Sequence, residues 1–357
     1  MFIGIDSGKN KHVCHTKGKT FTVKDNMEGY SKFLDKVCAQ ENNEEIVVCL
    51  ENKNSRFAKF LVSWGLEVRI MDGAQSNHLR QVLNISGKKD DIEDAKVLAR
   101  AAETFRESLE LLKIDKKLER LKGIMKLYKK ADTRFRRLVN MLHVDIKEEE
   151  PEFYDLVHIT NDSTLDYVAR SKVSSKLPSE AEKIDTNFSS IVKLTAMSTL
   201  SMKKEKKRLK REMKKELEKF YEYEILDSIK GAGTISCAVI IIVLREKDFT
   251  DCRGLQAYLG TSPITKSSGK KTYQVKRHSY NKYLGSKMVD MANCTLPYHD
   301  WCKQYYSKKR NEGKSHWAAL RALANIWLRI MFAMLKQKEP YHENEQGLPC
   351  RDKQIAC

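Results

Sequence analysis

The sequence predicts an α/β domain over residues 1–104, a long helical region over 105–223 and a mainly helical domain over 224–338. Three observations lead to this division. Short apolar runs that end in acids alternate with helical patterns in the first part. Long helical periodicity with almost no proline or glycine fills the second, and apolar helices flank a glycine-bearing turn in the third. Residues 339–357 are polar, which predicts a loose tail.

The N-terminal part has the element order of a ribonuclease-H-like sheet, in which three antiparallel strands precede alternating helices and strands. The run FIGID predicts a first strand, and HVCHT and TFTVK flank Lys17-Gly18-Lys19 as a hairpin does. The unbroken apolar run IVVCL predicts a strand covered on both faces. The remaining predicted elements are helices at 28–39, 56–64 and 90–102 and a strand at 66–71.

Four acids occupy the ends of these elements, and we predict that they form a metal site. Asp6 and Glu51 follow two strands that end at the same edge of the sheet, and Asp91 and Asp94 share one helix face. Converging carboxylates repel unless cations lie between them, and oxygen ligands suit Mg²⁺ or Mn²⁺. Two such ions, roughly 3.5 to 4 Å apart, can hold the attacking and leaving oxygens of a phosphodiester. Each acid alone also fits a turn former or a helix-dipole partner.

The composition points to a polyanionic partner. The 357 residues carry a formal net charge of +18 with a pI near 9.3, which favours nucleic acid, although ribosomal or membrane-surface binding gives the same bulk value. The longest apolar run is far shorter than the ~20 residues that span a bilayer, and no signal peptide precedes the first strand, so we expect a cytoplasmic protein with no membrane contact. Nine scattered cysteines without a C-x-x-C pair predict neither zinc nor disulfides.

Two long helical stretches, 118–142 and 184–223, predict a coiled-coil hairpin. Apolar residues recur along each at helical spacing, and cations cover the outer faces. The cations predicted to contact phosphate in the first stretch are Lys129, Lys130, Arg136 and Arg137. A solvated helical surface is the alternative. The hairpin is expected to bind nucleic acid or another subunit.

The third region carries two further candidate sites. In LDSIKGAGTISCA, Gly231 and Gly233 predict a helix-hairpin-helix whose backbone amides approach a phosphate. Predicted strands at 264–266 and 272–276 flank the turn Ser267-Ser268-Gly269-Lys270. A serine there is a candidate nucleophile, with positive charge from Lys270, Lys271, Lys276 and Arg277. Ordinary hairpin-turn chemistry explains the same residues.

Seven blocks of the sequence resemble the DEDD-type insertion-sequence transposases, relatives of the Piv and MooV DNA invertases. They are GIDSGKNKHV, VVCLEN, GLEVRIMDGAQ and GKKDDIEDAKVLAR near the N-terminus, and LDSIKGAGTISCA, LQAYLGTSPITKSSGK and HSYNKYLGSKMVDMA near the C-terminus. The resemblance implies a RuvC-like domain that holds Mg²⁺ with Asp6, Glu51, Asp91 and Asp94. It also implies that Ser268, with Ser267 as the rival, forms a phosphoserine with DNA.

The resemblance further implies a site composed from two subunits of a dimer or tetramer, and guidance by a structured bridge RNA that pairs with donor and target DNA. The chain departs from the family pattern at several positions. Asn52 to Phe57 replace a usual glycine and aromatic, and Lys230, Ile92, Tyr280 and Gly285 replace usual proline, arginine, glycine and arginine residues. Two alternatives remain open, a RuvC-like metal-dependent endonuclease that uses water and a non-catalytic nucleic-acid-binding protein.

Overall fold

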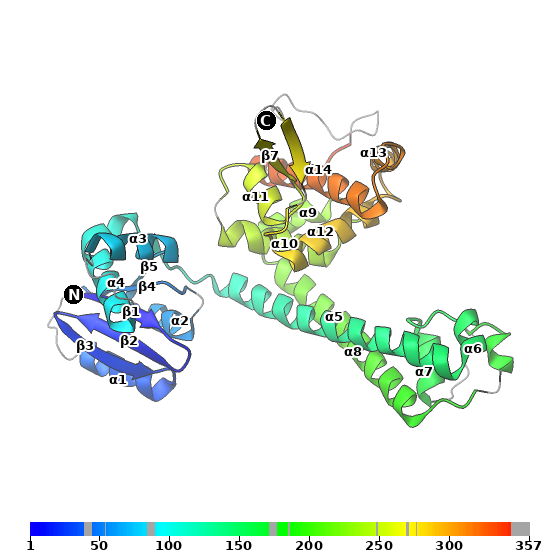
Figure 1. Ribbon diagram of the computed structural model, residues 1–357, viewed down its shortest axis with the longest axis horizontal. Coiled ribbons are helices and arrows are strands. Elements are labelled where there is room, and N and C mark those ends of the chain that lie inside the picture. Colours follow the sequence, from blue (N-terminus) through cyan, green and yellow to red (C-terminus); the bar gives the residue numbers. More distant parts are fainter. Residues whose placement is uncertain are drawn as a thin grey trace. The chain divides into compact units, whose positions relative to one another are not determined.

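The computed structural model forms two compact units, Met1–Asp115 and Lys116–Cys357, which are described separately (Figure 1). The residues that it describes are 1–38, 45–53, 55–83, 90–170, 177–184, 186–247, 249–268, 271–275 and 277–343. The boundary predicted after residue 223 falls inside the second unit. There, residues on both sides of the boundary share one hydrophobic core, including Leu121, Leu217 and Ile240.

The first unit contains a six-stranded sheet with the order β3-β2-β1-β4-β5-β6. Its strands are β1 (Phe2–Ser7), β2 (Lys11–Thr16), β3 (Lys19–Lys24), β4 (Val47–Leu50), β5 (Glu67–Ile70) and β6 (Glu110–Leu111). β1 pairs antiparallel with β2 and parallel with β4. Lys17 and Gly18, with φ of 44° and 75°, form the two-residue turn of the predicted hairpin. The predicted three-stranded antiparallel start and the buried central strand are therefore confirmed.

Helices cover both faces of this sheet. They are α1 (Met27–Cys38), α2 (Arg56–Ser63), α3 (Gly73–Leu83) and α4 (Asp91–Phe105), followed by a 3-10 turn at Arg106–Ser108. Ile3, Ile5 and Leu50 pack with residues of α1 and α2 on one face. Cys49 packs with Leu98 of α4 on the other. Because side chains alternate along a strand, this division fixes which face each residue of β1 and β4 occupies.

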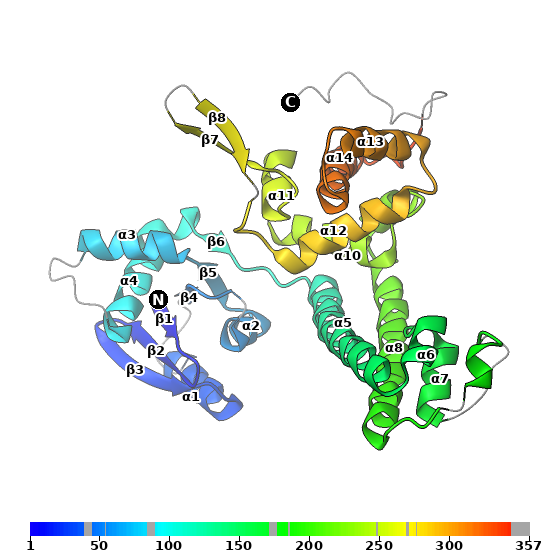
Figure 2. The same cartoon turned by 45° about the vertical axis from the view of Figure 1, so that its right-hand side comes forward.

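The second unit is mainly helical, with one β-hairpin beside α11 (Figure 2). Its elements are α5 (Lys116–Glu149), α6 (Pro151–Leu156), α7 (Asp162–Arg170), α8 (Ser190–Leu217), α9 (Tyr221–Asp227), α10 (Thr234–Glu246), α11 (Cys252–Tyr258), β7 (Ile264–Ser268), β8 (Lys271–Val275), α12 (Lys282–Thr295), α13 (Asp300–Asn311) and α14 (His316–Gln337), with a 3-10 turn at Ala181–Lys183. α5 and α8 pack side by side and antiparallel, as predicted. α8 begins later than predicted, because the Ser189 side chain caps it by accepting from the Val192 amide.

A buried ion cluster joins three helices of the second unit. Asp132 of α5 is 3% exposed. Its carboxylate lies 2.6 Å from Lys206 Nζ of α8 and 3.3 Å from Lys287 Nζ of α12. Burial alone would raise the pKa of Asp132, but the hydrogen bond from Lys206 and the charges of Lys287 and Arg136 outweigh it and lower the pKa. The cluster therefore holds an ionised carboxylate inside the helical packing.

α14 is the one helix among the described residues that is long and apolar enough to cross a membrane. In the structure it is a core helix of the second unit. Leu323, Trp327 and Met331 are fully buried in the cluster that also contains α10 and α12 residues. Burial of its apolar face against neighbouring helices accounts for its composition.

Candidate active site

The sheet edge where β1 and β4 end carries the first two acids. Ile5 pairs with Leu50 across the parallel strands, which places Asp6 beside Glu51 at the next position. Asp6 lies two residues after Gly4, and Glu51 lies two residues after Cys49. Since side chains alternate, both carboxylates continue the face that α4 covers. The sequence prediction that the two acids share one edge is consistent with this register.

The close packing of α4 on β1 brings in the other two acids. A Cβ on Gly4 would lie 2.0 Å from the Ala95 carbonyl oxygen and 2.2 Å from the Ala99 amide nitrogen. The helix backbone therefore touches the strand at Gly4. Asp91 lies one turn before Ala95, about 6 Å along the helix axis, and Asp6 lies about 6.6 Å along the strand from Gly4. Because the distance along α4 from Ala95 to Asp91 matches the distance along β1 from Gly4 to Asp6, the first turn of α4 comes near Asp6.

All three neighbouring acids affect the pKa of Asp6. Burial and, to a smaller extent, the charges of Asp91, Asp94 and Glu51 together raise the pKa of Asp6 to about 6, against a hydrogen bond from the Ser7 backbone amide that lowers it. Asp6 is half-buried, whereas Glu51 and Asp91 are exposed. The charges of Asp91, Asp94 and Glu51 thus all act on the carboxylate of Asp6, which keeps the four predicted acids as a candidate site.

Arg80 of α3 is a member of this site that sequence analysis missed. One of its terminal guanidinium nitrogens lies 2.6 Å from the Asp94 carboxylate, and the two side chains are only 12% and 14% exposed. A second terminal nitrogen donates to the Asn77 side chain at 3.0 Å. Arg80 could be placed at this site only by predicting α3. The sequence does not predict this helix, because Ser76 is its single buried residue. Arg80 neutralises part of the charge that α4 brings to Asp6.

The four carboxylates provide the kind of oxygen donor that binds a divalent cation. In the part of the chain that the structure describes, no three histidine, cysteine, aspartate or glutamate side chains are placed closely enough to share one ion. Glu51 and Asp91 are exposed, so rotation about their side-chain bonds is unhindered by a core. Hard carboxylate oxygens are what Mg²⁺ and Mn²⁺ bind, and a cation would relieve the repulsion on Asp6.

Replacing Asp6 by asparagine is expected to stabilise the metal-free protein at pH 7. The folded pKa of about 6 exceeds the ordinary 3.8, so the folded state binds more protons between these values and stability falls as pH rises from about 4 to 6. The rise of the pKa from 3.8 to about 6 corresponds to ~3 kcal/mol, and solvent screening reduces this to about 1–2 kcal/mol. Urea unfolding between pH 4 and 8 measures the effect.

Two comparisons sharpen this measurement. Asp35→Asn, which removes an exposed carboxylate from α1, is expected to leave the pH profile unchanged. Mg²⁺ or Mn²⁺ is expected to stabilise the natural protein more than Asp6→Asn, because the variant has lost one ligand. Equal stabilisation of both by metal would contradict the assignment of Asp6 as a ligand.

The two candidate serines are the last residues of β7, the first strand of the β7–β8 hairpin. Along the backbone, Ser268 pairs with Lys271 and Ser267 pairs with Thr272, so both serines lie at the end of β7, in the hairpin that Figure 2 shows beside α11. The predicted antiparallel pair of strands is confirmed, but the predicted turn is wrong in its bounds, because Ser267 and Ser268 belong to β7 and pair with residues of β8. Lys270 and Lys276 lie outside the described residues, as do the side chains of Ser267, Ser268 and Lys271. Arg277 follows the second strand and is partly buried.

The two glycines of the predicted helix-hairpin-helix have different surroundings. Gly231, with φ of 94°, lies between α9 and α10, and a Cβ there would be 2.7 Å from the Cys294 carbonyl oxygen. Packing of this turn against the end of α12 therefore requires glycine. Gly233 precedes α10 with open space around it. Of the two, Gly233 alone leaves room for a phosphate at the helix N-terminus.

The predicted cations of α5 also differ in their contacts. Arg136 pairs with Asp132 at 3.0 Å, and Lys129 Nζ lies 5.0 Å from the centre of the Tyr283 ring. Lys130 instead lines an open groove between α5 and α8. Arg137 is exposed. The structure thus divides one basic stripe into residues that support packing and residues that face solvent.

Both units match known transposase sequences. Residues 3–148 match a model described as a transposase, of the DEDD type associated with IS110, and residues 223–307 match the model of the transposase IS116/IS110/IS902 family. The first matched region covers most of the α/β unit and continues into α5, and the second includes α10, α11, the β7–β8 hairpin and α12. The chain belongs to the IS110/IS116 family of insertion-sequence transposases.

Individual relatives match over shorter segments. The chain is 30% identical over 128 residues to a Streptomyces coelicolor protein of the IS117 mini-circle that is named as a candidate transposase, covering 35% of this chain and 31% of the relative. It is 27% identical over 148 residues to the 43.6 kDa protein of IS110 from the same organism, covering 41% and 36%. It is 29% identical over 117 residues to a 44.8 kDa protein of IS116 from Streptomyces clavuligerus, covering 32% and 29%. Each match spans about a third of the relative's length.

Proposed function

We propose that this protein is a DNA transposase that cuts and rejoins DNA ends through a metal-assisted phosphoserine intermediate. The observation that carries the proposal is the grouping of Asp91, Asp94 and Glu51 around the half-buried Asp6: burial first, and then the charges of these three acids, raise the pKa of Asp6 to about 6. A structural role would not require four acids at one sheet edge. The strand order, with β1 central and β4 parallel to it, supports a ribonuclease-H-like, RuvC-like assignment of this unit.

Asp6, Glu51, Asp91 and Asp94 would hold Mg²⁺ or Mn²⁺, which when bound neutralises negative charge on the scissile phosphate. Asp6 supplies a fixed ligand, because β1 lies in the centre of the sheet. Asp91 and Asp94 supply ligands from the first turn of α4, where the helix N-terminus favours ionised carboxylates. Arg80 holds the Asp94 side chain in place from α3.

Ser268 is the proposed nucleophile. Its hydroxyl oxygen forms an ester with the DNA phosphorus while the bond from phosphorus to a sugar oxygen breaks, and that oxygen leaves as a hydroxyl with the proton. A sugar hydroxyl of the strand to be joined then attacks the phosphoserine and restores the serine. One ester replaces another at each step, so rejoining needs no external energy source. Lys270, Lys271, Lys276 and Arg277 would stabilise charge on the transferred phosphate.

The proposal includes a nucleic-acid guide and an oligomer. The net charge of +18 suits more than one polyanionic partner, and the resemblance to DEDD-type transposases supports a structured bridge RNA alongside donor and target DNA. The acidic unit of one subunit would act with the serine unit of another, in a dimer or tetramer. This arrangement would prevent cleavage by an unassembled chain.

Covalent trapping tests the proposal. We expect a protein–DNA adduct when the purified chain is incubated with Mg²⁺, labelled target duplex and RNA transcribed from the flanking DNA. Ser268→Ala and Asp6→Ala are expected to abolish the adduct, and Ser267→Ala, the neighbouring control, to retain it. Denaturing gel electrophoresis separates the adduct from free DNA.

Three results would each contradict a part of the proposal. Cleavage without an adduct, unaffected by Ser268→Ala, would identify a nuclease that uses water. An adduct that survives Ser268→Ala and disappears in Ser267→Ala would move the nucleophile to Ser267. Loss of all DNA chemistry in every variant and in the natural chain, with binding intact, would identify a non-catalytic nucleic-acid-binding protein.

A further inference from the structure

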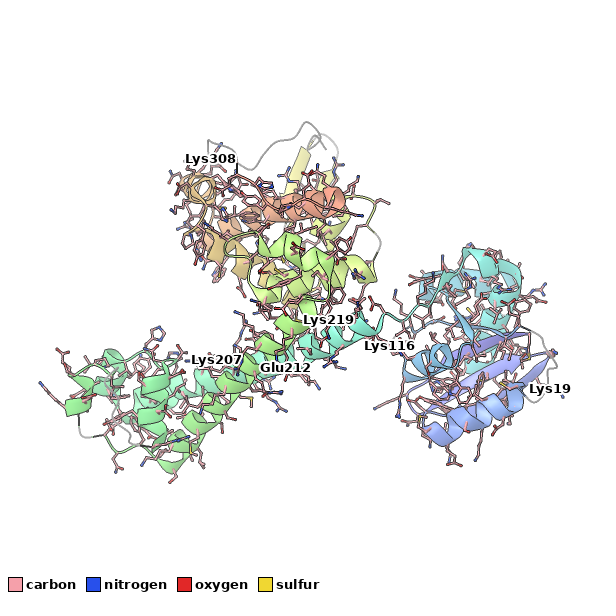
Figure 3. All side chains as sticks on the ribbon, turned by 180° about the vertical axis from the view of Figure 1, so that it is seen from behind. Lys19, Lys116, Lys207, Glu212, Lys219 and Lys308 are labelled. Atoms are coloured by element: carbon pink, nitrogen blue, oxygen red, sulfur yellow. The ribbon has the colours of Figure 1, made fainter. Side chains whose placement is uncertain are left out.

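An open groove of about 940 Å³ lies between α5 and α8, with the end of α7 at its rim. Figure 3 shows α8 with its dense cover of long side chains, and Lys207 and Glu212 mark the course of the helix. The groove lies wholly within the second unit. Six cationic side chains line it, namely Lys130, Arg134, Arg170, Lys204, Arg208 and Arg211.

The charge of this groove is poorly compensated. Glu205 is its one lining carboxylate, and Arg208 binds both oxygens of Glu205 at 2.7 and 2.8 Å. The other five cations form no ion pair with any residue that the structure describes. Side chains of like charge gathered in one concave surface raise the local concentration of anions. The positive charge of the groove therefore favours the binding of an anionic ligand.

The spacing of the cations suits a polymer. Lys204, Arg208 and Arg211 recur at i, i+4 and i+7 and form one stripe about 10.5 Å long. A nucleic-acid strand carries one charge per ~3.4 Å of axis, so the stripe spans about three phosphates. Lys130 and Arg134 form a second stripe of about 6 Å on the opposite wall. A single small anion would leave most of these cations unused.

The lining of the groove is partly apolar. Leu127 and Met197 are 53% and 44% exposed, although both are large hydrophobic side chains. A second copy of the chain is a poor occupant, because a two-fold contact through this face would bring the same cations against one another. Sugar rings between phosphates offer apolar surface and negative charge together.

We propose that this groove binds the phosphodiester backbone of the nucleic-acid partner. The inference rests on the proposed function and adds the surface that holds that partner away from the reacting groups. The groove uses Lys130 among the cations predicted from the sequence, together with Arg134, Lys204 and Arg211, whose common orientation depends on the packing of α5 against α8.

Charge reversal on one helix provides a matched test. The double variant Lys204→Glu/Arg211→Glu alters the groove, and Lys210→Glu/Lys214→Glu makes the same charge change at exposed positions of α8 that do not line it. Fluorescence anisotropy of the full chain in metal-free buffer would measure binding to duplex DNA, duplex RNA and single-stranded RNA of one sequence. Metal-free buffer prevents cleavage, so binding is measured independently of the serine mechanism.

The groove variant is expected to bind at least about tenfold more weakly, with a salt-dependence slope smaller by about 1.8 for duplex DNA, while the control stays close to the natural chain. The arm with the larger loss identifies RNA or DNA as the occupant. Equal losses in both doubles, or no loss in the groove variant, would overturn the inference. Changed self-association with unchanged nucleic-acid binding would also overturn it.

Folding and the proposed function are checked separately. Thermal unfolding of both double variants would confirm that they fold. If Lys204→Glu/Arg211→Glu does not fold, Lys204→Gln/Arg211→Gln takes its place and is compared with the same control. If the natural chain binds none of the nucleic acids, the proposed function fails together with the inference. If it binds them and only the groove comparison fails, the proposed function stands.

Discussion

Gly4→Ala is expected to destabilise the first unit by about 3 kcal/mol and to separate the four acids. The added Cβ would lie 2.0 Å from the Ala95 carbonyl oxygen, which belongs to the backbone of α4 and cannot rotate away. The helix must therefore move off the strand, taking Asp91 and Asp94 from Asp6. Urea unfolding measures the loss, and the stabilisation by Mn²⁺ is expected to disappear with it.

Gly123→Ala is the control for this substitution. Gly123 lies within α5, and a Cβ there would meet nothing within 4 Å. Alanine at this position is expected to stabilise the second unit by about 0.5–1 kcal/mol, because glycine is the poorer helix former. If Gly4→Ala unfolded at the same urea concentration as the natural protein, the close contact between α4 and β1 would be wrong.

Asp132→Ala is expected to destabilise the second unit by about 3–5 kcal/mol, because it leaves Lys206 and Lys287 without the buried carboxylate that they share, and Lys287 keeps only its pair with the half-exposed Asp290. Lys206 and Lys287 both face this carboxylate, and Lys287 is only 10% exposed. The change would also loosen α12 from the α5–α8 pair. Denaturant unfolding followed by circular dichroism measures the free energy of unfolding.

Asp290→Ala tests how much of the stability loss in Asp132→Ala comes from the burial of Asp132 and how much from an ion pair with Lys287. Asp290 also pairs with Lys287, at 3.2 Å, but its side chain is 50% exposed. Its removal is expected to cost less than about 1 kcal/mol, as for other exposed pairs. Similar losses for Asp132→Ala and Asp290→Ala would show that the burial of Asp132 does not determine its contribution.

Much of the first unit follows from the sequence because its elements carry local signals. The apolar runs of β1 and β4 and the turn at Lys17-Gly18 predict the strands, and their order predicts the edge at which Asp6 and Glu51 meet. α3 and β6 carry no such signal. α3 buries Ser76 alone, and both residues of β6 are exposed, so long-range packing decides whether these segments form regular structure.

The candidate sites show the same limit. The acids could be proposed from the sequence because Asp6 and Glu51 lie at the ends of recognisable strands and Asp91 and Asp94 lie in the first turn of a recognisable helix, whereas Arg80 depends on the position of α3. Helical periodicity also predicts the basic stripe of α5. It does not predict that Asp132 pairs with Arg136 or that Tyr283 approaches Lys129, since these partners become neighbours through tertiary packing.

The contact of Gly4 with Ala95 and Ala99 also bears on when the site comes into existence during synthesis. Asp6 and Glu51 leave the ribosome long before α4, and the sheet edge has only half of its carboxylates until that helix docks. A contact between such distant parts of the chain forms late, because the intervening loop must first close. Partly made or truncated chains that lack α4 also lack Asp91 and Asp94, and would therefore be unable to assemble the proposed metal site.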